Sequence, residues 1–425
     1  GKILNSLTDH FHHHLVRKES SQPLFNPTMT VADLCVALYG LQGCSSSHKF
    51  VRRHVDMSAR LLESYTGYEE VDFITLSKAF LGLQSMSNDS AEIRRMLRTL
   101  QQHLSRCIPA TSHGNSTISD IGTATAHCLY GLHSMSLFPT HGAEAEDELS
   151  GLMSLLHQDF ILPFVSTFDV ESIQRALYGL TSLINTTSSP NAEAIPHILN
   201  ILALLTHQLD KIFTEDLHNS PSDHDGDLDK RFNIFREIVP IYQTLNLLSH
   251  SLKHLRTQCG SDEKNCAVSL QIDILQASLF GLLQHLKAAV PTSDKDSNPS
   301  SQTEMIFFNH IERYIKENKK HGIMNVQLSE LIDGFSTDII VRIRHCSPEV
   351  SRTSTVNIEI DGPVHKFPRR KRFMALRDAY LKDSQDNFSV VRVDLENSGY
   401  KGSKLEVSLH EMMIRVEHAF MGVNE

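Results

Sequence analysis

The chain has 425 residues, which is long enough for two or three domains, or for one extended array with a cap. Apolar residues make up 40% and charged residues 21% of it, a balance typical of folded, water-soluble proteins. It contains no uninterrupted run of eighteen apolar residues, so we expect that no helix spans a membrane. Because the sequence starts at Gly1, we expect that it is trimmed or processed, and a targeting peptide would not be visible in it.

The net charge of −10 is distributed unevenly. Residues 305–425 hold 18 Lys and Arg against 17 Asp and Glu, and residues 1–304 hold 22 against 33. Affinity for a phosphate backbone comes largely from basic side chains, so the acidic front part is not an obvious polyanion binder. The seven cysteines are scattered without a CxxC pair, which argues against a disulfide framework or a zinc ribbon and favours buried, reduced thiols.

The front part of the chain repeats a short motif. Residues 37–46 read ALYGLQGCSS, 79–88 read AFLGLQSMSN, 128–136 read CLYGLHSMS and 176–183 read ALYGLTSL, with a weaker copy, SLFGLL, at 278–283. The central glycines are Gly40, Gly82, Gly131, Gly179 and Gly281, and the first three steps between them are 42, 49 and 48 residues. The last gap, of 102 residues, is wide enough to hold one degenerate copy, near residues 241–249.

Each of the first four copies is followed by a second segment with helical spacing. In residues 91–104, for example, the apolar side chains of Ile93, Met96, Leu97 and Leu100 recur three and four positions apart. A unit of two amphipathic helices can cover its apolar face only with the next unit. We therefore predict a mainly α protein, an α-solenoid of two-helix repeats over residues 1–290.

The glycine of the motif would lie inside a helix, where it costs about 1 kcal/mol relative to alanine. We expect that it lets neighbouring first helices pack closely; the alternative is that it bends the helix and exposes a binding surface. The serine-rich ends of the motif are typical of helix stops and of the next N-cap, as at Asn88, Asp89 and Ser90. In the alternative interpretation these polar residues face a nucleotide-binding groove.

Two polar segments resemble metal sites only superficially. Asp223, Asp225, Asp227 and Asp229 surround Gly226 like a calcium loop, but the final bidentate glutamate is missing, which favours a solvated acidic loop. The run from His10 to His14 has no acidic or cysteine partner at a fixed spacing, so we interpret it as a polar helix face. Residues 291–304 read as a linker, which places a domain boundary there.

Residues 305–425 change to an alternating pattern of helices and strands, which predicts a separate small α/β domain. We expect helices at 305–319, 368–383 and 405–420, and strands at 338–344, 355–361 and 389–395. In the second strand the apolar residues alternate, so Asn357, Glu359 and Asp361 share the opposite face. Asp338 opens the preceding strand, and three acids with His365 near adjacent strand ends are a set that could bind Mg²⁺.

The segment from Glu359 to His365 reads E-I-D-G-P-V-H, and it resembles the E-x-D-G-P-x-H signature of the RAP domain. The resemblance covers about residues 335–400. That domain is similar to very-short-patch-repair endonucleases, a branch of the restriction-endonuclease-like fold. In the family, RAP domains close helical-repeat arrays in organellar proteins of RNA processing and translation and in ribosome-associated proteins. The repeats here are longer than the usual ones of that family, so we assign no base-reading code.

The resemblance implies an organellar protein, mitochondrial or alternatively plastid, that binds ribosomal or messenger RNA together with protein subunits of a ribonucleoprotein. It also raises a nuclease hypothesis with Asp338, Glu359, Asp361 and His365 as catalytic residues. Such nucleases carry a lysine where this chain has Asp361, so Mg²⁺-dependent cleavage would need His365 as the base. The alternative is that Asp361 caps the turn at Gly362 and Pro363 and that Glu359 pairs with an arginine; we favour it, and expect no metal or cofactor.

The densest basic run of the chain lies next to this motif. The RNA-binding candidates are Lys366, Phe367, Arg369, Arg370, Lys371, Arg372 and Arg377. Basic groups beside an aromatic ring can hold a phosphate and stack a base, whereas an ordinary solvated helix face would look similar in sequence. We therefore expect an RNA-binding adaptor. The alternatives are a metal-dependent RNA endonuclease and a protein-binding scaffold, which the acidic front part would suit.

Overall fold

The computed structural model describes residues 30–65, 71–107, 118–137, 146–185, 193–218, 237–259, 265–290, 302–317, 323–346, 351–361, 368–394, 413–416 and 418. The chain divides into two compact units, Gly1–Ala288 and Ala289–Glu425, and each is described by itself. The first unit is helical and the second contains a four-stranded mixed sheet, so the prediction of a mainly helical protein with a small C-terminal sheet is confirmed.

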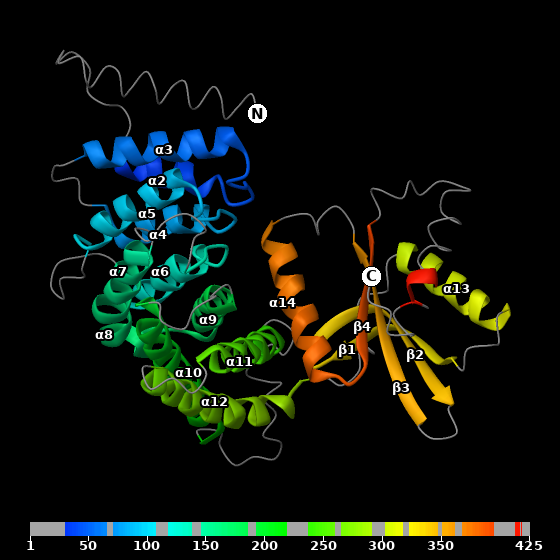
Figure 1. Ribbon diagram of the computed structural model, residues 1–425. Coiled ribbons are helices and arrows are strands. Elements are labelled where there is room, and N and C mark those ends of the chain that lie inside the picture. Colours follow the sequence, from blue (N-terminus) through cyan, green and yellow to red (C-terminus); the bar gives the residue numbers. More distant parts are fainter. Residues whose placement is uncertain are drawn as a thin grey trace. The chain divides into compact units, whose positions relative to one another are not determined.

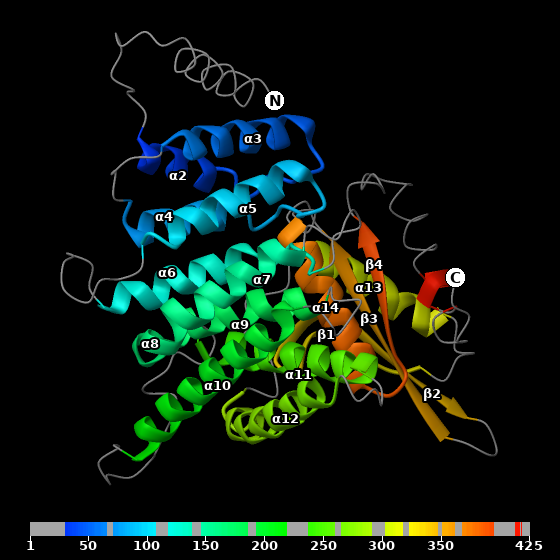
Figure 2. The same ribbon diagram turned by 60° about the vertical axis from the view of Figure 1, so that its left-hand side comes forward.

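The helices of the first unit pack in two rows (Figures 1 and 2). The first row contains α2 (Val31–Tyr39), α4 (Phe73–Gly82), α6 (Ile118–Gly131), α9 (Val170–Asn185) and α11 (Val239–Cys259), each in contact with the next. The second row contains α3 (Lys49–Ser64), α5 (Ala91–Leu104), α7 (Glu146–Leu155), α10 (Ala194–His218) and α12 (Cys266–Lys287). After α7 the chain continues through a π-helical turn (Leu156–Ile161), the short α8 (Leu162–Phe164) and a 3₁₀ turn (Val165–Thr167).

The helices α2 and α4 of the first row begin at polar caps. Thr30 and Asp33 form a capping box at α2, the Thr30 side chain accepting from the Asp33 amide at 3.1 Å. Asp72 accepts from the Thr75 amide at the start of α4, at 2.7 Å. At α5 the expected cap is different: Ser90 occupies the N-cap position without a capping bond from its side chain.

The motif glycines lie where consecutive first-row helices touch. A Cβ atom built on Gly82 would be 2.1 Å from the carbonyl oxygen of Leu38 in α2. On Gly131 it would be 2.2 Å from the oxygen of Phe80, and on Gly179 it would be 2.3 Å from that of Leu129. Real Cβ atoms do not approach an oxygen so closely. Each of these helix pairs can therefore pack at this distance only because glycine has no side chain at the contact. The expectation that these glycines allow close packing is confirmed.

Polar residues after each glycine hydrogen-bond to the neighbouring helix pair. Ser85 donates to the Gln42 carbonyl at 2.9 Å, and Ser182 donates to the His133 carbonyl at 2.6 Å. Asn88 donates to the Ser136 carbonyl at 2.7 Å and accepts from the Ser136 amide at 2.9 Å. The serine-rich segments therefore connect successive pairs.

The two weaker copies of the motif lie in different rows. Residues 241–249, where a degenerate copy was expected, belong to α11, which packs on α9 as a first-row helix. Gly281 belongs to α12, a second-row helix, and a Cβ atom built on it would meet nothing within 4 Å. Gly281 is therefore not equivalent to the packed glycines, although its sequence context is similar.

Six cysteines have side chains that the structure describes, and all six are free. Cys35, Cys128 and Cys259 are buried, as expected, and burial raises the pKa of Cys35 to about 12, which keeps this thiol protonated. Cys266, in contrast, is exposed. Among the described helices, α12 has the length and apolar composition of a membrane span, and only 28% of its apolar window is buried. One such helix is weak evidence, so the expected absence of a span stays a prediction.

The second unit consists of α13 (Gln302–Glu317), β1 (Ile323–Ile332), β2 (Phe335–Cys346), β3 (Ser351–Asp361), α14 (Pro368–Ser384) and β4 (Phe388–Asp394). The strands lie in the order β1-β2-β3-β4 (Figure 1). The first two pairs are antiparallel and β3–β4 is parallel, with α14 as the crossover. One face of the sheet carries the apolar core, to which α13 contributes Phe307 and Ile311.

Strand β1 was not predicted from the sequence. It forms a hairpin with β2 through Asp333 and Gly334, whose φ angles of 48° and 79° are both left-handed. Asp-Gly is a favoured pair for such a two-residue turn, because both positions need positive φ. The turn was therefore visible in the sequence, but the strand before it contains Ser329 and Glu330 among its apolar residues, which weakened the pattern.

Candidate nucleic-acid interface

The face of the sheet opposite the apolar core carries charged residues. The pairing registers place Glu359 of β3 beside Arg392 of β4, and Ile358 beside Ile339, so that Asp338 of β2 lies on the other side of Glu359. Asn357 and Asp361, two residues before and after Glu359 in β3, lie on the same face, as the alternation in β3 predicted. Three strands thus contribute polar side chains to one buried cluster.

Arg377 of α14 reaches into this cluster. Its guanidinium lies 2.9 Å from Glu359 Oε2 and 3.0 Å from Asp378 Oδ1, and its side chain is only 8% exposed. Asn357 donates to the other oxygen of Glu359 at 2.7 Å. Both oxygens of this buried carboxylate are therefore occupied by protein donors, as the arginine-pairing interpretation of Glu359 predicted.

Arg392 joins the remaining carboxylates. It donates to Asp361 Oδ1 at 2.8 Å and to Asp378 Oδ2 at 2.6 Å, and so connects β3, β4 and α14. The predicted capping role of Asp361 concerns residues 362–367, which lie outside the described residues. Arg377 and Arg392 together pair with three carboxylates, of which only Asp378 contacts both, and burial makes the pair of Arg377 with Glu359 costly to break.

Asp338 differs from the other acids. Its Oδ2 atom accepts from the Ile360 amide at 2.6 Å. Burial, and then the negative charge of Glu359, raise the pKa of Asp338 to about 7, whereas the Ile360 amide and Arg377 lower it. Near neutral pH this carboxyl group therefore carries a proton in part of the molecules.

The basic candidates divide into two groups. Arg370 and Lys371 are exposed in the first turns of α14, and Arg372 is half-buried. Arg377 is buried in the carboxylate cluster, so its assignment as an RNA contact is corrected: it neutralises Glu359 instead. The side chain of Arg369 and all of His365, Lys366 and Phe367 lie outside the described residues.

The helix carrying the basic run is held against the sheet at several points. Phe373 packs on Phe335 of β2, with ring centroids 6.3 Å apart. Near the other end of α14, Tyr380 donates to Asp333 Oδ2 at 3.1 Å and Gln385 donates to the same atom at 3.2 Å. Aromatic packing, the buried ion pairs and the hairpin turn together set the orientation in which α14 presents Arg370 and Lys371.

Three members of the cluster, Asn357, Asp378 and Arg392, were not predicted as site residues. A signal for Arg392 existed, since it stands between Val391 and Val393 in an alternating strand and must therefore face away from the apolar core. Asp378 had no comparable signal, because an acid beside Arg377 on a helix is usually solvated. The candidate metal ligands of the sequence segments 10–14 and 223–229 lie outside the described residues.

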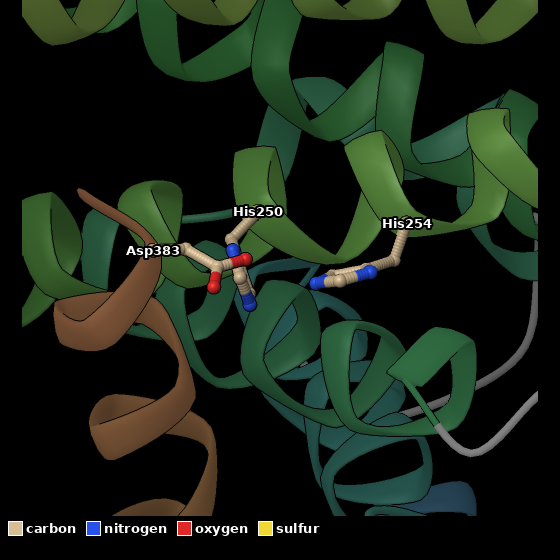
Figure 3. Close-up of side chains that lie close together, drawn as sticks. All are labelled: His250, His254 and Asp383. Carbon is tan, nitrogen blue, oxygen red and sulfur yellow. The ribbon is translucent and has the colours of Figure 1, made fainter. Parts of the chain in front are cut away.

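A pair of histidines stands apart from this site. His250 and His254, one turn apart on α11, have ring centroids 4.5 Å apart and rings at 84° (Figure 3). Asp383, also labelled there, belongs to α14 of the second unit. Two imidazoles are fewer than the three or four protein ligands of an ordinary zinc site.

No protein-family model, no curated protein and no solved structure matches this chain.

Proposed function

We propose that the protein is an RNA-binding adaptor of an organelle, mitochondrial or alternatively plastid, in which an α-solenoid carries a RAP-like domain of restriction-endonuclease-like fold. The observation that carries this proposal is the division of the basic residues in the second unit. Arg370 and Lys371 are exposed at the start of α14, whereas Arg377 and Arg392 are taken up by the domain's own carboxylates.

The position of the exposed pair favours an anionic ligand. The N-terminal end of a helix already carries a partial positive charge, so basic side chains there oppose the helix dipole and lower helix stability. The first turn of α14 contains no acidic residue to offset them. A phosphate placed at this end would interact favourably with both the dipole and the side chains. The ligand class follows from this charge; its being RNA rests on the resemblance of residues 359–365.

Cleavage of RNA is less well supported. A divalent ion would have to compete with Arg377 for Glu359 and with Arg392 for Asp361, both of which already have charged partners within 3 Å. The lysine that orients water in the similar nucleases is replaced by Asp361. The same carboxylates are instead paired with Arg377 and Arg392 of the domain itself.

The first unit is better suited to proteins than to RNA. Several of its basic side chains pair with acids of adjacent helices: Arg95 lies 2.6 Å from Glu63, Arg98 2.9 Å from Glu148, and Arg52 3.7 Å from Glu92. Such pairs add to the acidic balance of residues 1–304, which hold 22 basic against 33 acidic residues. We infer that the helical array supplies contacts to protein subunits of a ribonucleoprotein, organised around ribosomal or messenger RNA.

Replacement of Arg370 and Lys371 by alanine tests the proposal. We expect the affinity for single-stranded RNA to fall about three- to tenfold at moderate salt, and the slope of log K against log salt to decrease by about one to two. Filter binding or fluorescence anisotropy over a salt series measures both. Lys382→Ala, an exposed lysine at the other end of α14, is the matched control and should leave both values nearly unchanged.

An unchanged RNA affinity and salt slope in the Arg370→Ala/Lys371→Ala protein would contradict the proposal. Incubation of labelled RNA with Mg²⁺ addresses the nuclease alternative, and we expect no cleavage. Cleavage that disappears in Asp361→Ala would establish an enzyme instead of an adaptor.

A further inference from the structure

Three consecutive first-row helices carry a nitrogen-bearing side chain at one equivalent position, four residues before the packed glycine. These residues, here called the ladder, are Lys78 in α4, His127 in α6 and Arg175 in α9 (Figure 2). Each packed glycine contacts the backbone two residues before the preceding motif glycine, so the helices stack in one register. The ladder residues are therefore neighbours, and Arg175 Nη1 lies 3.1 Å from His127 Nε2.

The ladder side chains are only half-buried, although the next residue in each helix is fully buried. A second row of side chains lies three positions further along the same helices and consists of Leu81, Tyr130 and Tyr178. The rings of Tyr130 and Tyr178 are 5.7 Å apart between centroids, which confirms that equivalent residues of α6 and α9 meet. The first-row helices thus place basic groups beside large amphipathic side chains.

The ladder carries two cations, with a neutral imidazole between them. Burial, and then the positive charges of Arg175 and Lys78, lower the pKa of His127 to about 4, so this ring is uncharged near neutral pH. Arg175 is paired with Glu171 of the same helix, whose side chain is 61% exposed. Among the described residues, no carboxylate forms an ion pair with Lys78. One cation is therefore not neutralised, and the other is held by an exposed pair of the kind that stabilises little.

We propose that an acidic segment of a partner protein binds in extended form along the ladder, with carboxylates on Lys78 and Arg175. This rests on the proposed function, in which the helical array contacts protein subunits. Packed helix axes lie about 8–10 Å apart, so α4 and α9, two steps apart, are separated by about 16–20 Å. An extended chain rises about 3.3 Å per residue, so carboxylates about five or six residues apart match this separation.

An acidic protein segment fits these charges better than RNA does. RNA has a phosphate at every nucleotide, whereas the ladder has two cations on three helices, with Glu171 beside one of them. Residues 1–304 hold 33 acidic against 22 basic residues, and this excess repels a long polyanion along its whole length. A protein segment can place two carboxylates on the cations and neutral residues over His127 and Tyr130.

Fluorescence anisotropy of the full-length chain with a labelled peptide tests the proposal. The probe is a peptide of about fourteen residues with glutamate at every third position, and the control probe has glutamine there. We expect micromolar binding of the glutamate peptide that weakens with salt, and no measurable binding of the glutamine peptide. Lys78→Gln/Arg175→Gln should lower the affinity at least about fivefold. Arg60→Gln/Lys211→Gln, which removes two exposed cations of the second row, is the matched control.

A third variant, Glu171→Gln, gives a result that misfolding cannot imitate. Removal of this carboxylate releases Arg175, so the affinity for the glutamate peptide should rise about two- to fivefold. Circular dichroism checks that each variant is folded. An unchanged or lower affinity in Glu171→Gln would overturn the proposal. So would a glutamate peptide that does not bind, or equal losses in the two double variants.

Single-stranded RNA as a second probe separates this inference from the proposed function. We expect its affinity to depend on Arg370 and Lys371 and to be unchanged in Lys78→Gln/Arg175→Gln. Loss of RNA binding in that double variant would make the ladder an RNA site and overturn the proposal. If the peptide fails to bind while RNA affinity still depends on Arg370 and Lys371, the inference is wrong and the RNA-binding adaptor stands.

Discussion

Arg377 decides the charge balance of the second unit at the scale of single residues. It lies between Glu359 and Asp378 with 8% of its side chain exposed, and Arg392 binds the other side of Asp378. Neighbouring Arg370 and Lys371 on the same helix are exposed. Basic residues of one helix thus have opposite roles, since Arg370 and Lys371 are exposed whereas Arg377 is buried.

Arg377→Met should destabilise the second unit by about 3–5 kcal/mol, because Glu359 would be left buried without its cation. Arg370→Met, on the same helix but exposed, should change the free energy of unfolding by less than about 0.5 kcal/mol. Urea unfolding measures both. Adding Glu359→Gln to Arg377→Met should restore part of the loss, since the unpaired charge is removed; equal stabilities of the two single variants would contradict the assigned ion pair.

Asp338 makes stability depend on pH. Its pKa is about 7 in the folded protein and near the ordinary value of 3.8 when unfolded, so the folded state binds more protons between these values. The contribution of Asp338 to the free energy of unfolding is therefore highest below about pH 4. It declines as the pH rises from about 4 to about 7, and it is constant above about pH 7. Asp338→Asn should remove this decline and be more stable than the unmodified protein at pH 8, by at least about 1 kcal/mol.

Urea unfolding at pH 5 and pH 8 tests this pH dependence. Asparagine retains an oxygen that can accept from the Ile360 amide, so the variant changes the charge with little change in hydrogen bonding. Asp383→Asn, at an exposed position of α14, is the control. If the Asp338→Asn protein loses the same stability between the two pH values as the unmodified protein, another group is responsible.

At the scale of elements, the glycines determine how closely first-row helices approach. Gly131 touches the backbone of α4, and Gly281 faces open space in α12. Gly131→Ala should therefore destabilise by about 1–3 kcal/mol, because the helices must separate to admit a methyl group. Gly281→Ala should stabilise by up to about 1 kcal/mol, through helix propensity alone. Thermal unfolding compares them, and two changes of the same sign would contradict this account.

The elements themselves were largely predictable. The glycine motif and the three-and-four spacing of apolar residues predicted helix pairs, because amphipathic helices show their buried stripe in sequence. In the second unit the expected strands at 338–344 and 355–361 fall within β2 and β3, and residues 389–394 of the third expected strand fall within β4. The missed strand β1 is interrupted by polar residues, and its pairing with β2 through Asp333 and Gly334 is what stabilises it.

At the scale of the whole molecule, the two units have separate cores. Differential scanning calorimetry should therefore resolve two transitions, since each unit buries its own apolar side chains. Gly131→Ala should lower the midpoint of only the transition of the first unit, and Arg377→Met only that of the second. A single transition shifted by both variants would show that the units unfold as one cooperative block.

The sequence by itself determined the helical array, the α/β character of the C-terminal part and the shared face of Asn357, Glu359 and Asp361, because these follow from periodicity within one segment. Only the tertiary structure decided which charges meet. Glu359 and Arg377 are 18 positions apart, and Asp361 and Arg392 are 31 apart, so their pairing depends on how α14 crosses between β3 and β4. It likewise decided that Gly82 is packed and Gly281 open, because a glycine carries no side chain that would reveal its neighbour.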